Sequence, residues 1–220
     1  MTKPSFFAAR GAFARAGASG PQRWFWPGLL FLLVWGNAPA QEAGPAGQHH
    51  HAAAPLEAAV TRSEHMYYEP DAVLKDVDGR NVALRALLES DEPVMLDFIY
   101  TSCTAICPLL SETFAQVQRD IGDGTARLRM VSISIDPEYD TPKVLRAYAQ
   151  TFHAGPQWRF LTGNPKDIAE VLTAFDAFRA NKMDHAAIVL LRSSQGKAWI
   201  RFDGLVSPAT LVSELRAMQR

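Results

Sequence analysis

The chain has 220 residues, of which 48% are hydrophobic, and carries 22 Lys and Arg against 23 Asp and Glu, for a formal net charge of −1. It has no basic surplus, which argues against nucleic acid or an anionic lipid surface as the main partner. Its only two cysteines, Cys103 and Cys107, lie in one short segment. We therefore expect them to act as a unit that binds a soft metal, forms a redox disulfide, or does both.

Residues 1–40 have the layout of a secretory signal. They contain four basic residues and no acidic one, and an apolar stretch over 24–35 precedes a small-residue A-x-A site at 38–40. The apolar stretch is shorter than the roughly 20 residues of a membrane-spanning helix, so cleavage is expected and an uncleaved membrane anchor is the alternative. Removing this segment leaves 18 basic residues against 23 acidic ones. In either case we expect the rest of the chain outside the cytoplasm, where disulfides persist.

Residues 41–66 are predicted to form a flexible linker. They are rich in Ala, Gly, Pro and Gln and lack the apolar periodicity that a core requires. The linker contains His49, His50 and His51, whose neutral imidazoles suit weak binding of copper, nickel or zinc. The alternative is that these histidines form a solvated polar patch.

Residues 67–220 are predicted to form one globular domain with a single core. The pattern predicts a hairpin around the Asp-Gly turn at 78–79 and a buried strand over 94–100. The helix that follows the cysteines has an apolar face. Beyond it we expect, in chain order, a strand over 128–135, a helix from 142, a helix near 168–175, strands over 186–191 and 198–202, and a helix over 208–218.

This order of elements predicts an α/β fold with a mixed central sheet flanked by helices and an N-terminal hairpin extension. The strand–helix–strand start implies a parallel right-handed crossover, and the late pair of strands implies antiparallel edge strands. The cysteines follow the first central strand, at the carboxyl end where α/β sheets place their sites. The predicted arrangement is thioredoxin-like.

The spacing of the two cysteines bears on their chemistry. If both lie on a regular helix, positions i and i+4 share a face, with Cβ atoms about 5–6 Å apart. A relaxed disulfide needs about 3.5–4.5 Å, so oxidation would require a local rearrangement. Two thiolates one turn apart can instead hold Cu(I), or zinc if four ligands are present.

A third ligand is sought among the histidines of the domain. His185 is the best candidate, because the predicted sheet brings the segment before its last strand pair towards the cysteines. The alternative for His185 is a partly buried histidine that caps a strand. Met183 could supply a soft thioether sulfur, but we expect its side chain to pack.

Several motifs resemble the SCO/SenC family in the same order along the chain. These are the segment 97–108 with its Cys-x-x-x-Cys-Pro, the segment 131–145 with its Asp-Pro-Glu-Tyr-Asp-Thr-Pro, the segment 158–163, and the pair 184–185. The similarity covers roughly residues 68–218. The resemblance implies a thioredoxin-like fold, a periplasmic or intermembrane-space location, and copper bound by two cysteines and one histidine.

Carried over residue by residue, the resemblance implies a copper site made of Cys103, Cys107 and His185. The metal expected is Cu(I), with Cu(II) as a second state. Two positions depart from the family pattern: Thr104 stands where many members have Pro, and Ser102 replaces a commoner His. Neither change removes a ligand, but both bear on thiol acidity and redox potential.

The function implied by the resemblance is a copper metallochaperone for the dinuclear copper site of cytochrome c oxidase. Its expected partners are the copper-bearing subunit or another copper protein, and other periplasmic copper chaperones. The alternative is an extracytoplasmic thiol–disulfide oxidoreductase that uses Cys103 and Cys107 without His185; no classical enzyme is predicted. Asp136 is a weaker candidate beside the site, whereas Asp140 and Thr141 are expected to form a turn and a helix cap.

Overall fold

The computed structural model describes residues 60–219 except 90, 123–126, 195 and 197. The expected signal segment and His49, His50 and His51 lie outside these residues. Within the part that is described, no helix is long and apolar enough to cross a membrane.

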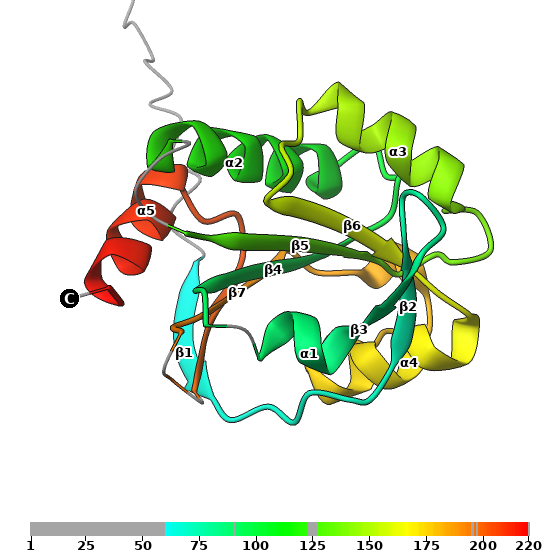
Figure 1. The fold of residues 1–220 in the computed structure, drawn as a ribbon, viewed down its shortest axis with the longest axis horizontal. Coiled ribbons are helices and arrows are strands. Elements are labelled where there is room, and N and C mark those ends of the chain that lie inside the picture. The colour runs from blue at the N-terminus through cyan, green and yellow to red at the C-terminus, as the bar shows by residue number, and fades with distance from the viewer. Residues whose placement is uncertain (1–59, 90, 123–126, 195, 197, 220) are drawn as a thin grey trace, which may run out of the picture. The chain divides into compact units, whose positions relative to one another are not determined.

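A single eight-stranded mixed sheet forms the centre of the domain, with strand order β1-β8-β7-β4-β5-β6-β2-β3 (Figure 1). Strands β4, β5 and β6 are parallel to one another, and the remaining neighbours pair antiparallel. The strands are β1 (Thr61–His65), β2 (Val73–Asp76), β3 (Asn81–Ala83), β4 (Val94–Ile99), β5 (Arg129–Ser134), β6 (Trp158–Thr162), β7 (Ile188–Arg192) and β8 (Trp199–Asp203).

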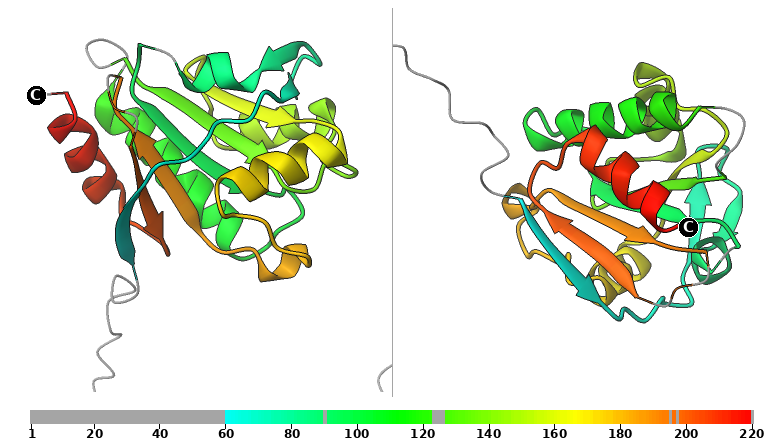
Figure 2. Two further views of the ribbon diagram at one scale, coloured as in Figure 1. Left: turned by 90° about the horizontal axis from the view of Figure 1, so that it is seen from below. Right: turned by 90° about the vertical axis from the view of Figure 1, so that its left-hand side faces the viewer.

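Helices cover both faces of the sheet, as two views show (Figures 1 and 2). On one face lie α2 (Ile106–Ile121), α3 (Pro142–Thr151) and α5 (Pro208–Ala217), and on the other lie α1 (Leu84–Leu88) and α4 (Pro165–Ala174). Each face has its own apolar cluster, because alternate residues of β4 point to opposite sides. All six residues of β4 are buried, as expected for a central strand.

The predicted thioredoxin-like α/β fold is confirmed, and the β2–β3 hairpin extends the sheet beyond β6. Strand β6 was not among the expected strands. Strand β8 is not an edge strand, because β1 pairs along its outer side. Strand β1 occupies residues that were expected to belong to the linker. Its sequence, TRSEH, is polar and carries no apolar alternation, so only its pairing with β8 reveals it.

Candidate metal and thiol site

The two cysteines lie where β4 gives way to α2. Cys103 precedes the helix, in a turn closed by a bond of 3.1 Å from its backbone amide to the carbonyl of Tyr100. Cys107 is the second residue of α2. The expectation that both thiols share one helical face is therefore wrong. A helix that included Cys103 would place Pro108 in its second turn, where the proline ring clashes with the preceding turn.

Both thiols are free and buried, with 8% of Cys103 and none of Cys107 exposed. Burial raises the pKa of Cys103, but hydrogen bonds from the backbone amides of Cys107 and Ala105 outweigh it and leave this pKa below its ordinary value. Burial also raises the pKa of Cys107, and its contact with the Cys103 sulfur raises it further. The pair thus combines an acidified thiol with a neutral one, and the two sulfurs are hydrogen-bonding neighbours.

Tyr100 lies between the cysteine turn and the segment that carries His185. Its hydroxyl lies within hydrogen-bond reach of two sulfurs, that of Cys103 and the Sδ of Met183 at 3.6 Å, and its single proton can be donated to only one of them at a time. The Nζ of Lys182 lies 5.7 Å from the centre of the same ring. Burial, followed by the neighbouring Cys103, raises the pKa of Tyr100 to about 12, so the phenol stays protonated at neutral pH. The expectation that Met183 packs is wrong, since 71% of it is exposed.

His185 follows the short 3-10 helix η2 (Lys182–Asp184) and is buried. Its Nε2 donates to the backbone carbonyl of Phe98 at 2.8 Å, which places the proton on Nε2. Its Nδ1 is buried and has no hydrogen-bond partner among the described residues. Burial lowers the pKa of His185, so the imidazole is neutral. Nδ1 therefore keeps an unused lone pair, which is what a metal ligand requires.

The cysteines and His185 lie at the same end of β4 but are not assembled around a common point. Within the described part of the chain, no group of three His, Cys, Asp or Glu side chains is close enough to hold a metal ion. The three ligands that the sequence predicts thus lie at the same end of the central strands. Cys103 and Cys107 are in contact there, and His185 is separate from them. Binding of one ion by all three requires a movement of the η2 segment or of the His185 side chain.

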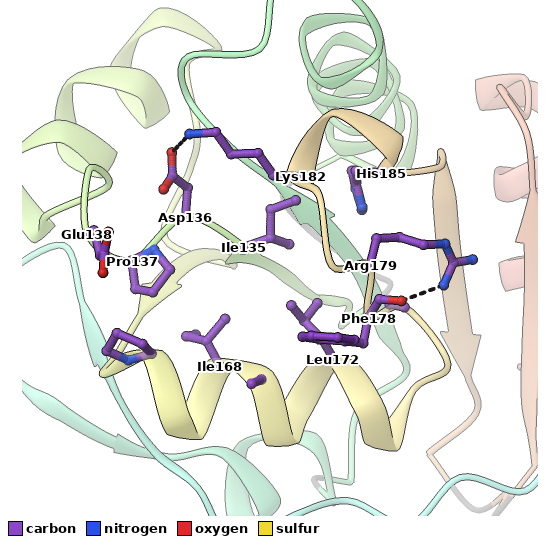
Figure 3. Close-up of a pocket in the computed structure, with 13 residues that line it drawn as sticks. Ile135, Asp136, Pro137, Glu138, Ile168, Leu172, Phe178, Arg179, Lys182 and His185 are labelled. Carbon is purple, nitrogen blue, oxygen red and sulfur yellow. Dashed lines mark hydrogen bonds and ion pairs between the residues drawn. The ribbon is translucent and has the colours of Figure 1, made fainter.

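A pocket of about 240 Å³ is lined in part by His185 (Figure 3). Its floor is apolar and includes Ile168 and Leu172 of α4, which point into it. On its rim, Lys182 pairs with Asp136 at 2.5 Å.

The acidic residues after β5 have separate roles. Asp136 pairs with Lys182 and so ties the β5–α3 loop to η2 beside the site. Thr141 caps α3 as predicted, accepting from the amide of Val144 at 3.4 Å. Asp140, by contrast, is fully buried and accepts from Thr101, in the turn that leads to Cys103. The sequence reasoning missed this positioning role; the available signal was a further acidic residue four positions after Asp136.

The fold and the site together define a thioredoxin-like domain with a reduced cysteine pair at the start of its first long helix. A sequence profile described as SCO1/SenC matches residues 64–220. The chain therefore belongs to the SCO1/SenC family.

Curated relatives include a protein described as a SCO1 protein homolog from Bacillus subtilis, 35% identical over 104 residues, or 47% of this chain and 52% of the relative. A SCO2-like protein from Rickettsia conorii is 30% identical over 132 residues, covering 56% of this chain and 63% of the relative. The chain thus spans half to two thirds of the length of these relatives.

Solved structures of similar fold include two proteins at 26% identity. One is BsSco, described as having a disulfide switch and as a member of a family of cytochrome c oxidase assembly proteins; its TM-score is 0.60, with 71% of this chain and 95% of that chain covered. The other is Bradyrhizobium japonicum ScoI with copper bound; its TM-score is 0.56, with 66% and 96% covered.

Proposed function

We propose that this chain binds copper through Cys103, Cys107 and His185 and delivers it to a copper-bearing subunit of cytochrome c oxidase. The observation that carries the proposal is the unpartnered Nδ1 of a neutral, buried His185 at the sheet edge that carries the thiol pair. Two sulfur donors and one imidazole nitrogen form a set that suits copper. The copper-bound Bradyrhizobium japonicum ScoI supports the choice of metal.

Copper is the cargo of the proposed reaction, and the site is suited to hand it on. Cys103 keeps 8% of its surface exposed, and its lowered pKa makes its proton easier to lose to an incoming ion than an ordinary thiol's. Burial raises the pKa of Cys107 and so keeps its thiol neutral. The thiol therefore loses its proton only when a metal ion takes the place of that proton. Thiolates or imidazoles of the acceptor would then displace the ligands one by one.

The bond from His185 to Phe98 would orient the ligand. A metal-binding imidazole needs its second nitrogen fixed, and the Phe98 carbonyl already accepts from Nε2. Movement of η2 towards Cys103 and Cys107 would bring Nδ1 to the thiols. This movement would break the contact between Tyr100 and Met183, which is a weak bond to a partly solvated sulfur.

We also propose that the domain works outside the cytoplasm, in the periplasm, after secretion or on a membrane anchor. The composition of residues 1–40 supports this location. The copper-bearing subunit, or another copper protein, would be the acceptor, and other periplasmic copper chaperones would be the donors. The description of BsSco as a member of a family of oxidase assembly proteins supports the acceptor.

A second function is favoured by the unequal acidity of the two thiols. The Cys103 thiolate can attack a disulfide of an acceptor and form a mixed disulfide, releasing one acceptor thiolate. Attack by Cys107 on the Cys103 sulfur would then free the second acceptor thiolate and leave a Cys103–Cys107 disulfide. This reduces the acceptor by two electrons and requires no role for His185.

A copper titration of the reduced protein, read by X-ray absorption, tests the first proposal. We expect two sulfur ligands and one nitrogen ligand in the unaltered chain, and loss of the nitrogen in His185→Ala. His65→Ala is the matched control, because His65 lies on β1, away from the cysteine turn. If His185→Ala loses copper yet still matures the oxidase fully, copper delivery is wrong and thiol reduction is the better account.

A further inference from the structure

Met183 places a thioether sulfur beside the cysteine pair while most of its side chain faces solvent. Its Sδ accepts from the Tyr100 hydroxyl at 3.6 Å, and 71% of the residue is exposed. The same hydroxyl reaches the Cys103 sulfur. One phenol oxygen therefore touches both sulfurs, so displacement of the phenol would let them share an ion.

Met183 is held in this position from both sides. The side chain of Asn181 accepts from the Met183 amide at 3.0 Å. Lys182 is tied to Asp136 at 2.5 Å and lies over the Tyr100 ring. Before any movement of η2, these contacts hold the thioether on the turn beside the thiols.

The chemistry of a thioether fits the capture of Cu(I). Thioether sulfur is a soft, neutral ligand that binds without losing a proton, so it can bind copper where a thiol would first have to ionise. Met183 is also two residues from His185, on the same short segment. A movement of η2 that brings His185 to the cysteines would carry Met183 with it.

We propose that Met183 is a further Cu(I) ligand, which captures the ion at the surface and holds it with Cys103 before His185 takes its place. The proposal rests on the proposed copper function of the same site. Copper remains Cu(I) throughout, the Tyr100 phenol keeps its proton, and the step exchanges the Met183 thioether for the His185 imidazole.

Nuclear magnetic resonance of the full chain, reduced and labelled with carbon-13 at its methionine methyl groups, tests this contact directly. On addition of Cu(I) to the His185→Ala variant, in which no imidazole can replace the thioether, we expect the Met183 methyl resonance to shift, with the assignment made from Met183→Leu. Met66 is the internal control, because it is 70% exposed but belongs to no part of the site, and its resonance is expected to stay in place.

Removal of the sulfur should also slow the uptake of copper. Met183→Leu keeps a similar volume and should lower the rate of Cu(I) uptake from a chelator about tenfold, whereas Met66→Leu should not change it. In His185→Ala, where Met183 would remain a ligand, X-ray absorption should count three sulfurs, and two after Met183→Leu is added.

The outcomes separate the two proposals. If His185→Ala binds copper through two sulfurs only, with the Met183 resonance in place, and Met183→Leu takes up copper normally, Met183 is not a ligand and the proposed function stands. If the unaltered chain takes up no copper at all, the proposed function is wrong, and the role of Met183 with it.

Discussion

The carboxylate of Asp140 accepts hydrogen bonds from both the backbone amide and the hydroxyl of Thr101. The distances are 3.1 Å to the amide and 2.5 Å to the hydroxyl, and the hydroxyl of Ser134 donates to the same carboxylate at 2.6 Å. Asp140 is fully buried. It therefore joins the end of β5, the start of α3 and the turn that carries Cys103.

Replacement of Asp140 by alanine should destabilise the domain and loosen the cysteine turn. The change leaves three donors on Thr101 and Ser134 without their acceptor, and an unsatisfied buried donor costs about 1–3 kcal/mol. We expect the free energy of unfolding to fall by roughly 2–4 kcal/mol in urea titrations.

Asp136→Ala is the matched control for this prediction. Asp136 lies in the same loop, but its partner Lys182 has a side chain that is 44% exposed. The Asp136 side chain itself is 13% exposed, but its partner is solvated, and such pairs contribute about 1 kcal/mol, so this variant should lose less stability than Asp140→Ala. Equal losses in the two variants would mean that Asp140 contributes no more than a surface charge.

Local sequence signals predicted most of the helices and strands. Helix α3 begins with Thr141 as the cap and Pro142 in the first turn, and the structure shows this start. The mostly apolar run of β4 and the long, regular apolar periodicity of α2 likewise predicted buried elements.

The parts that the sequence did not predict depend on contacts between distant segments. Strand β1 is recognisable only by its pairing with β8, and the burial of Asp140 only by its bond to Thr101. The contact between the Met183 sulfur and the Tyr100 hydroxyl also joins segments that are distant in the sequence, so the sequence did not predict it. His185 was found as a candidate, but its separation from the thiols depends on how η2 docks on the domain.

Alkylation should modify Cys103 before Cys107. Cys103 is slightly exposed and its pKa is lowered, whereas Cys107 is fully buried and its pKa is raised. At neutral pH we expect iodoacetamide to react at least about tenfold faster with Cys103 in the reduced protein, as measured by peptide mass spectrometry. Raising the pH through the lowered pKa should increase this rate until the thiol is fully ionised. First modification at Cys107 would contradict the assignment of the acidified thiol.

Tyr100→Phe should raise the pKa of Cys103. The hydroxyl of Tyr100 is one of the donors that stabilise the Cys103 thiolate, and the substitution removes it with little change of volume. Ultraviolet titration of the thiolate in the variant should therefore show ionisation at higher pH. Tyr148→Phe is the control, since the Tyr148 hydroxyl pairs with Ser111 at 2.9 Å instead. Identical thiolate titrations for Tyr100→Phe and the unaltered chain would remove Tyr100 from the thiol site.

Asp97 is a buried carboxyl in the middle of β4, on the face covered by α2. Neither of its oxygens has a hydrogen-bond partner of normal geometry among the described residues. Burial raises its pKa from 3.8 to about 7. Between the two pKa values the folded state holds a proton that the unfolded chain has lost. The free energy of unfolding therefore falls as the pH rises from about 4 to about 7, and this carboxyl has no further effect above that pH.

Asp97→Asn should abolish this decline, because the amide has nearly the same shape and no charge. A shift of about three units corresponds to about 4 kcal/mol at most, so the variant should gain up to this amount over the unaltered chain at pH 8. At pH 4, where the native carboxyl is protonated, the gain should vanish. Urea unfolding across this range measures both, and the exposed Asp91, as Asp91→Asn, is the control for loss of a charge. Parallel pH profiles for Asp97→Asn and the unaltered chain would show that Asp97 titrates in the folded protein as it does in the unfolded one.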